Sequence, residues 1–245
     1  MKKFVTFNVN GLRSAWTKGL RSVLLDINAD VILLQEIRCS GEDLDEFGIA
    51  GYESYFCPSN VPGRGGVGAF SRIPVLNVFE GLGVPSRAGE GRVMTLKFDS
   101  FFLVNVYAPA GSTSEDPEEE KAAWFDDFRK MVSFFERKKP VVICGDLNIV
   151  SPLCGPSYSR NLRVVYEDAA AFRRLLNVGF MDAWFISGAL DTYVTWVPYG
   201  LPEACGQRLD YFLVSNLLLN KMGPLSVLDV KGISDHRPVV LYLDI

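Results

Sequence analysis

The sequence predicts an α/β protein in which two β-sheets pack face to face and helices cover their outer surfaces. Several apolar runs, among them 31–34 and 141–144, have the continuous hydrophobicity of strands that are buried on both faces. The order of elements also roughly repeats, with strands and a helix followed by further strands and a helix. Because two packed sheets would bury this many apolar strands, we expect one α/β domain over residues 1–245.

The composition agrees with a chain that folds around a large core. Hydrophobic residues make up 48% of the 245 residues and aromatic residues 12%, while charged residues reach only 22%. This length lies within the range of single α/β domains, and no linker or low-complexity segment interrupts it. The net charge of −4 excludes a global positive field, so any binding of a polyanion needs a local basic patch or metal ions.

Cysteine usage and the N-terminus bear on the compartment. The five cysteines include no C-x-x-C pair, so we expect reduced thiols in an intracellular protein. Residues 1–8 contain too short an apolar run for a signal peptide, and no run of about eighteen apolar residues occurs. We therefore expect no membrane segment, and a location in the nucleus of a eukaryote or in the cytoplasm of a prokaryote.

The first half of the chain reads as strands with one early helix. Residues 3–8 alternate as a strand that ends at Asn8, and Leu20, Val23, Leu24 and Ile27 recur at helical spacing. The strand over 31–34 ends at Gln35-Glu36, and 41–46 is a loop or a helix end. Further strands are expected over 52–57, 67–71, 75–79, 92–98 and 101–107.

The second half begins with a long helix. Asp116-Pro117-Glu118-Glu119 supplies a cap, a proline at the first helical position and a glutamate at the third, and the apolar face runs to Phe135. The strand over 141–144 leads into Gly-Asp-Leu-Asn, and a loop extends to about Arg163. Phe172, Leu175 and Leu176 mark another helix. The last strands are expected over 193–196, 208–214, 227–230 and 239–243.

Five of these strands are expected to end in polar residues, and the loop with the only histidine adds a sixth position. The set comprises Asn8 with Asn10, Gln35 with Glu36, Tyr107, Asp146 with Asn148, Asp210 and His236. Any one of them has an ordinary explanation as a cap or turn residue. Such groups are costly when buried without partners, so their gathering at one edge lets them share a metal ion and hydrogen bonds.

The set suggests hydrolysis of a phosphodiester. Glu36 offers the hard oxygen ligand that Mg²⁺ prefers, and Asp146 could orient or deprotonate a water molecule. Asn148 follows two residues later and is expected on the same strand face, where it can hold that water or a phosphate oxygen. Asp210 could hold His236 in its charged form, which would bind the scissile phosphate. No serine stands in an evident nucleophile elbow, which disfavours acyl transfer.

These residues resemble the exonuclease-III-type apurinic/apyrimidinic endonucleases of the endonuclease/exonuclease/phosphatase superfamily. The matching segments occur in the order of the family and span nearly the whole chain. They are FNVNGLR at 7–13, LQE at 34–36, GVG at 66–68, EGRV at 90–93, NVYAP at 105–109, GDLN at 145–148, RLDY at 208–211 and SDH at 234–236. The EGR and RLDYF segments resemble the branch that acts in base-excision repair.

The resemblance implies a four-layer αββα sandwich with its site at one end of the sheets. It implies Mg²⁺-dependent cleavage of double-stranded DNA 5′ to an abasic site, with Mn²⁺ as a substitute, and accompanying exonuclease and 3′-end-cleaning activity. The enzyme would act as a monomer. The implied metal site comprises Glu36 with Asn8, Asn10 and Asp235 nearby. The implied catalytic residues are Tyr107 on the phosphate, Asp146 on the water, Asn148, and the pair of Asp210 and His236.

The sequence departs from the family pattern at the substrate side of the site. Asn10 stands where some members carry aspartate, and Gln207 stands where many carry a tryptophan that walls the abasic-sugar pocket. The loop over 111–116 is acidic, and the segment over 150–165 is short. These differences concern substrate preference and the second metal position. Phosphate contacts are expected from the loop arginines Arg13, Arg64, Arg92 and Arg160.

Two other interpretations stay open at this point. One is another phosphodiesterase of the superfamily, either a retrotransposon-type nicking endonuclease or a phosphoesterase acting on phosphoinositides or sphingolipids. The absence of a reverse transcriptase from these 245 residues disfavours the former. The other is a catalytically inactive relative that only binds nucleic acid. An inactive relative is expected to lose part of the set formed by Glu36, Asp146, Asn148, Asp210 and His236, and all five are present.

Overall fold

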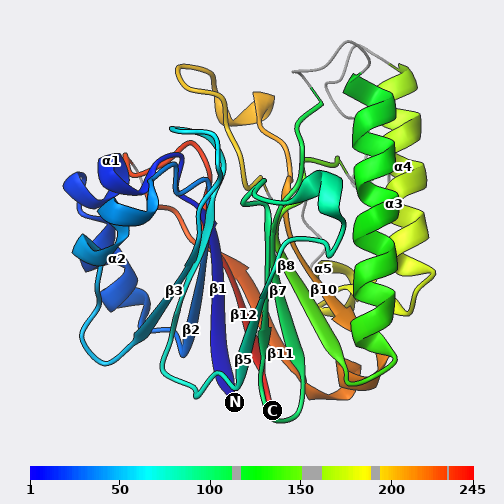
Figure 1. Cartoon of the computed structure of the whole chain (residues 1–245), viewed down its shortest axis with the longest axis horizontal. Coiled ribbons are helices and arrows are strands. Elements are labelled where there is room, and N and C mark those ends of the chain that lie inside the picture. Colours follow the sequence, from blue (N-terminus) through cyan, green and yellow to red (C-terminus); the bar gives the residue numbers. More distant parts are fainter. Residues whose placement is uncertain (112–116, 151–161, 189–193, 231) are drawn as a thin grey trace.

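Two six-stranded β-sheets form the middle of the computed structural model, which describes residues 1–111, 117–150, 162–188, 194–230 and 232–245 (Figure 1). The first sheet has the order β11 (Met222–Val227), β12 (Val239–Leu243), β1 (Lys2–Asn8), β2 (Val31–Gln35), β4 (Val67–Ser71) and β3 (Glu53–Cys57). The second has the order β5 (Asn77–Glu80), β6 (Val93–Lys97), β7 (Phe102–Tyr107), β8 (Val141–Asp146), β10 (Asp210–Ser215) and β9 (Phe180–Asp182).

The two sheets repeat one pairing pattern. In each, the third and fourth strands along the sheet are parallel, as β1 with β2 and β7 with β8. All other pairs are antiparallel. The carboxyl ends of all four parallel strands meet at one end of the molecule, where polar residues end each run. The repeated order of elements in the sequence therefore predicted a real internal repeat.

Helices cover the outer face of each sheet and complete four layers (Figure 1). The short helices α1 (Leu12–Thr17) and α2 (Leu20–Ile27) lie against the first sheet, where Leu20, Leu24 and Ile27 are buried. The longer helices α3 (Pro117–Glu136) and α4 (Leu162–Leu176) lie against the second sheet. The αββα sandwich implied by the resemblance is confirmed.

Three apolar cores hold these layers together. The central one lies between the sheets, and the outer two lie under the helices. On α3 the fully buried rings of Trp124 and Phe128 stack at 5.3 Å, which fixes the helix against the second sheet. Helix α3 has the bounds that its proline and its apolar face predicted.

A buried polar cluster ties the two sheets together beneath the site. Asn105 of β7 donates to the carbonyls of Leu34 (3.0 Å) and Gly68 (2.8 Å) in the opposite sheet. Its amide oxygen accepts from Gln35 at 2.6 Å, and Gln35 also donates to Thr6 at 2.9 Å. Because unpaired amides would be costly here, the cluster fixes how the sheets stack at the end that carries the site. Gln35 therefore supports the site from below rather than lining it.

Several element predictions were wrong in position. The strand expected over 227–230 lies over 222–227, and no strand covers the described residues 194–196, where Trp196 forms only isolated bridges. Strand β11 was misplaced because Gly223 and Pro224 are untypical of strands, although an edge strand such as β11 tolerates them. Helix α1 and the three-residue β9 were missed. The segment expected as a loop or helix end is a 3₁₀-helix over Gly41–Glu46, and α4 begins at Leu162, close to the predicted end of the loop. Tyr193 lies outside the described residues.

Within the described residues, no helix is both long enough and apolar enough to cross a bilayer.

Candidate active site

Asn8, at the end of β1, connects acids from both sheets. Its Nδ2 donates to Glu36 Oε1 and to Asp146 Oδ2, each at 2.9 Å. Glu36 follows β2 in the first sheet, and Asp146 ends β8 in the second. Asn8 is fully buried, so one amide group holds two carboxylates that would otherwise repel each other.

Asp146 sits in a nearly closed environment at the end of β8. Its Oδ1 accepts the backbone N–H of Asn148 at 2.9 Å, and its residue is 1% exposed. Burial raises the pKa of its carboxyl to about 7, against the opposing effect of the nearby His236. A carboxyl group with this pKa can accept a proton from water near neutral pH.

Asn148 lies beyond the end of β8, in a left-handed conformation with φ 49°. The sequence-based expectation that it shares a strand face with Asp146 is therefore wrong. Its Nδ2 instead donates to the carbonyl of Ala108 at 2.9 Å, and it lies 3.5 Å from Asp146 Oδ2. The turn, not the strand alternation, brings the two side chains together.

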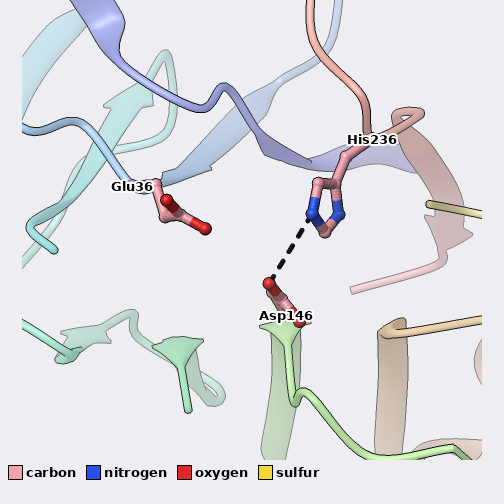
Figure 2. A group of neighbouring side chains, drawn as sticks. All are labelled: Glu36, Asp146 and His236. Atoms are coloured by element: carbon pink, nitrogen blue, oxygen red, sulfur yellow. Dashed lines mark ion pairs between the residues drawn. The ribbon is translucent and has the colours of Figure 1, made fainter. Parts of the chain in front are cut away.

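His236 is paired with Asp210 at the start of β10. Asp210 stands directly across from Asp146 in the antiparallel register of β8 and β10, so it begins its strand rather than ending it. Its Oδ2 lies 2.8 Å from His236 Nδ1, and Thr195 Oγ1 holds its backbone N–H at 3.0 Å. His236 Nε2 in turn lies 3.9 Å from Asp146 Oδ2, the contact drawn in Figure 2.

The charge state of His236 follows from this pairing. Burial lowers the pKa of the imidazole, but the charge and the hydrogen bond of Asp210, together with the charge of Asp146, outweigh it. The net effect raises the pKa to about 9. His236 is therefore an imidazolium at neutral pH, with Nδ1–H donating to Asp210 and Nε2–H directed toward the cluster.

The loop before β12 places a further carboxylate at the opening of the site. Asp235 accepts from Asn10 Nδ2 at 2.8 Å and from Trp196 Nε1 at 2.9 Å. Ser234 bonds the carbonyl of Asn8 at 2.8 Å and accepts the backbone N–H of His236 at 3.1 Å. The loop is therefore fixed to the end of β1, which explains why Asn10 and Asp235 are in contact although they are 225 positions apart in the sequence.

The donor set fits a divalent cation. One ligand atom from each of Glu36, Asp146 and His236 lies within 4.8 Å of the others (Figure 2). Asn8 and Asn10 add amide groups, and Asp235 adds a further carboxylate beside them. Carboxylate and amide oxygens are the ligands that hard divalent cations prefer. A charged His236 is a donor rather than a ligand, so the acids would hold the ion.

Tyr107, at the end of β7, faces Glu36 across the site. Burial raises the pKa of its phenol, and the charges of Glu36 and Asp146 raise it further, so the hydroxyl stays protonated. The Arg92 guanidinium lies over its ring at 5.0 Å and is 3.3 Å from its carbonyl. Glu90 lies 3.9 Å from Arg92 and accepts from the Trp124 indole of α3 at 2.9 Å.

A cavity of about 520 Å³ opens beside Glu36 and Tyr107. We call it the arginine pocket, because its lining includes Arg38, Arg64, Arg87, Arg92 and Lys121. Of the arginines expected to contact DNA, Arg64 and Arg92 line it. Arg13 lies on α1 in ion pairs with Asp43 (2.7 Å) and Glu46 (3.5 Å), and Arg160 lies outside the described residues.

Sequence reasoning missed several residues that build the site. Lys121 of α3 donates to the carbonyl of Asn148 at 2.7 Å and pairs with Asp168 of α4 at the same distance. Arg208 and Asp182 form a buried two-point ion pair (3.1 and 2.7 Å) just before β10. The isolated charges Lys121 and Asp168 within otherwise apolar helix faces were the available signal for the first pair.

Comparisons with known proteins agree with this geometry. The model of the endonuclease/exonuclease/phosphatase family matches residues 5–236. An exodeoxyribonuclease of Bacillus subtilis is 32% identical over 253 residues, which cover 99% of this chain and all of that protein. The DNA repair nuclease APEX1 of Danio rerio is 33% identical over 255 residues, covering 98% and 82% respectively.

The fold is also similar to that of a solved structure. An AP endonuclease from Archaeoglobus fulgidus superposes with a TM-score of 0.86 at 25% identity, over the full length of both chains. Sequence and structure thus agree along the whole chain, and the chain belongs to the endonuclease/exonuclease/phosphatase family.

Proposed function

We propose that the protein is a Mg²⁺-dependent DNA-repair phosphodiesterase. It would cleave the DNA backbone 5′ to apurinic/apyrimidinic sites and leave a 3′-hydroxyl, with additional 3′–5′ exonuclease and 3′-end-cleaning activity. The observation that carries the proposal is the convergence of Asn8, Glu36, Asp146, Asp210 and His236 at one end of both sheets. Relatives named exodeoxyribonuclease and DNA repair nuclease, similar over nearly the whole chain, support the substrate class.

The residues divide the chemistry between them. Asp146, with a pKa near 7, would take the proton of the attacking water, while Asn148 orients that water or a phosphate oxygen. The imidazolium of His236, held by Asp210, would donate to the phosphate and stabilise its growing negative charge. Tyr107, protonated and braced by Arg92, would donate to another phosphate oxygen.

Glu36 would be the main metal ligand, with Asp235, Asn8 and Asn10 around it. A bound Mg²⁺ would neutralise phosphate charge and help the leaving oxygen depart. Glu36 suits this role because its side chain is only 12% exposed and its position is fixed by Asn8. Mn²⁺ would substitute, since it accepts the same oxygen ligands.

DNA would lie across the end of the sandwich that carries the site. Arg64 and Arg92, in the arginine pocket, would contact phosphates on one side of the cleaved bond. Arg13 and Arg160 stay predicted phosphate contacts from the sequence. Because both sheets contribute catalytic residues, we infer one catalytic domain over 1–245. We further propose that it acts as a monomer, since every residue given a catalytic role comes from one chain. DNA as substrate would place the protein inside the cell, in the nucleus of a eukaryote or the cytoplasm of a prokaryote.

The proposal is tested with a 5′-labelled duplex that carries one tetrahydrofuran abasic analogue. We expect one cut immediately 5′ to the analogue with Mg²⁺, none with EDTA, and none with the His236→Asn variant. Duplexes ending in a 3′-phosphate, undamaged DNA and a phosphoinositide serve as parallel substrates. Cleavage of any of these with no cut at the abasic analogue would assign the site to another branch of the family, and would refute the abasic-site substrate.

A further inference from the structure

Arg38 lies between the carboxylate cluster and the arginine pocket. Its Nε donates to Glu36 Oε2 at 3.0 Å, and its Nη2 contacts the same oxygen. The other oxygen, Oε1, accepts from the Asn8 amide that also holds Asp146. The two oxygens of Glu36 therefore have different surroundings: Oε1 faces the acids of the cluster, and Oε2 is neutralised by a guanidinium.

The backbone conformation holds Glu36 and Arg38 in position for this ion pair. Glu36 and Arg38 both have φ 52°, a left-handed conformation that costs free energy for residues other than glycine. Hydrogen bonds on both sides of the segment stabilise it. Gly11 N–H donates to the Glu36 carbonyl at 2.8 Å, and Arg38 N–H donates to the Gly65 carbonyl at 2.9 Å. Buried Ile37 between them makes the two charged side chains neighbours, so the pair is not a chance contact between mobile surface chains.

We propose that Arg38 competes with the divalent cation for Glu36 and that cation binding releases its guanidinium into the arginine pocket, where it binds substrate phosphate. This inference rests on the proposed function, because it takes Glu36 as a metal ligand. The charge of Glu36 would be shared between the guanidinium at Oε2 and the divalent cation at the cluster, and the two cations repel at this separation. Arg38 is the partner that can leave, since its side chain is 42% exposed and that of Glu36 only 12%.

The released guanidinium has a suitable place to go. Arg38 itself lines the arginine pocket, together with Arg64 and Arg92, and a guanidinium matches phosphate oxygens in a two-point geometry. Cation binding and phosphate binding would therefore favour each other through Arg38. By linkage, the factor by which the cation raises DNA affinity equals the factor by which DNA raises cation affinity.

A static role for Arg38 makes the opposite prediction. If Arg38 stays in place and only orients Glu36 for the metal, its removal leaves Glu36 less ordered and weakens cation binding. If it competes, its removal strengthens cation binding. The sign of the change therefore separates the two roles, and no abasic substrate is needed to measure it.

Mn²⁺ binding to the full chain, followed by the electron paramagnetic resonance signal of free Mn²⁺, tests the competition. Ion pairs of this exposure are worth up to ~1 kcal/mol, so we expect Arg38→Gln to bind Mn²⁺ about fivefold more tightly than the wild type. Arg38→Lys, which keeps the charge, should stay within about twofold of the wild type. Arg64→Gln removes a charge from the same pocket without touching Glu36 and should also change affinity by less than about twofold.

Unchanged or weaker Mn²⁺ binding by Arg38→Gln would overturn the competition. Mn²⁺ binding by none of the proteins would refute the metal site itself, which separates that failure from failure of this inference. The coupling is tested with the abasic-analogue duplex, by comparing its Kd in EDTA and in Ca²⁺. Arg38→Gln should lose most of the gain in affinity given by Ca²⁺, whereas Arg64→Gln should bind more weakly in both and keep the ratio. An unchanged ratio for Arg38→Gln would refute the release into the pocket.

Discussion

Replacing Asp210 with Asn isolates the charge that keeps His236 protonated. The substitution keeps the shape of the side chain, and Asn Oδ1 can still accept from His236 Nδ1, now at 2.8 Å from Asp210 Oδ2. The backbone N–H of residue 210 keeps its bond to Thr195 Oγ1, so the start of β10 stays in place. What changes is the full negative charge beside a buried imidazole.

The magnitude follows from the pKa of His236. It lies at about 9, against an ordinary value of 6.5, and one pH unit corresponds to 1.36 kcal/mol, so the surroundings favour the imidazolium by about 3 kcal/mol. Burial alone lowers this pKa, and Asp210 is the largest contribution that raises it. Without its charge we expect a pKa of about 6.5 or below. At pH 7.5 the charged fraction would then fall from nearly all of the molecules to about a tenth or less.

The measurement is unambiguous because His236 is the only histidine in the chain. Its imidazole resonances in a ¹H–¹³C NMR titration report one pKa, with the exposed Asp26→Asn of α2 as a control that also removes one negative charge. We expect titration near pH 9 in the wild type and the control, and at 6.5 or below in Asp210→Asn. The alkaline limb of the cleavage rate should move down in the same direction. A wild-type pKa near 6.5, or no change in the variant, would refute the charge assignment.

Three further predictions, one of them with a control variant, concern the scaffold and the metal site. Gly145→Ala should cost about 3 kcal/mol of unfolding free energy in urea, because its Cβ would lie 2.0 Å from the Val106 carbonyl oxygen, whereas Gly81→Ala, also at positive φ but in open space, should cost only about 1 kcal/mol. Asp182→Asn should cost about 3 kcal/mol in the same assay, since it removes the negative charge of the carboxylate that holds the buried Arg208 at two points; a cost below that of Gly81→Ala would contradict this. Glu36→Ala should lose cleavage at low Mg²⁺ and partly recover it at high Mg²⁺, and equal loss at all concentrations would mean that Glu36 holds structure instead.

The fold was predictable from sequence where burial leaves a clear pattern. The apolar runs of β2 and β8 and the apolar face of α3 stand out because each is buried along its whole length. Elements without that pattern were misplaced. Strand β11 is an edge strand with half-exposed residues, and β9 has only three residues, so neither carries a periodic signal.

The sequence predicted which types of residue form the site and which end of the strands carries them. It did not predict which of these side chains hydrogen-bond to one another. That Asn8, Glu36, Tyr107 and Asp146 gather at one end follows from the two pairs of parallel strands, whose carboxyl ends they occupy. Asp210 and His236 reach the same end because they lie at or just before the start of antiparallel strands. That a single Asn8 amide bonds Glu36 and Asp146 does not follow, since it depends on how the two sheets stack over each other. The left-handed turns at Glu36, Arg38 and Asn148 also escape prediction, because none of these positions is a glycine. These left-handed backbone conformations are stabilised by the surrounding hydrogen bonds and not by the residue types themselves.

These contacts explain how the chain assembles four carboxylates in one place. Glu36, Asp146, Asp210 and Asp235 would repel one another, yet each accepts at least one hydrogen bond from a donor within the site. The donors are the amides of Asn8 and Asn10, the Trp196 indole, the Arg38 guanidinium and the His236 imidazolium. Aspartate in place of Asn10 would remove a donor and add a fifth charge, which only a cation could balance. The amides therefore let the polypeptide fix the geometry of the acids by itself, so the proposed cation would need to displace only the exposed Arg38 guanidinium from Glu36.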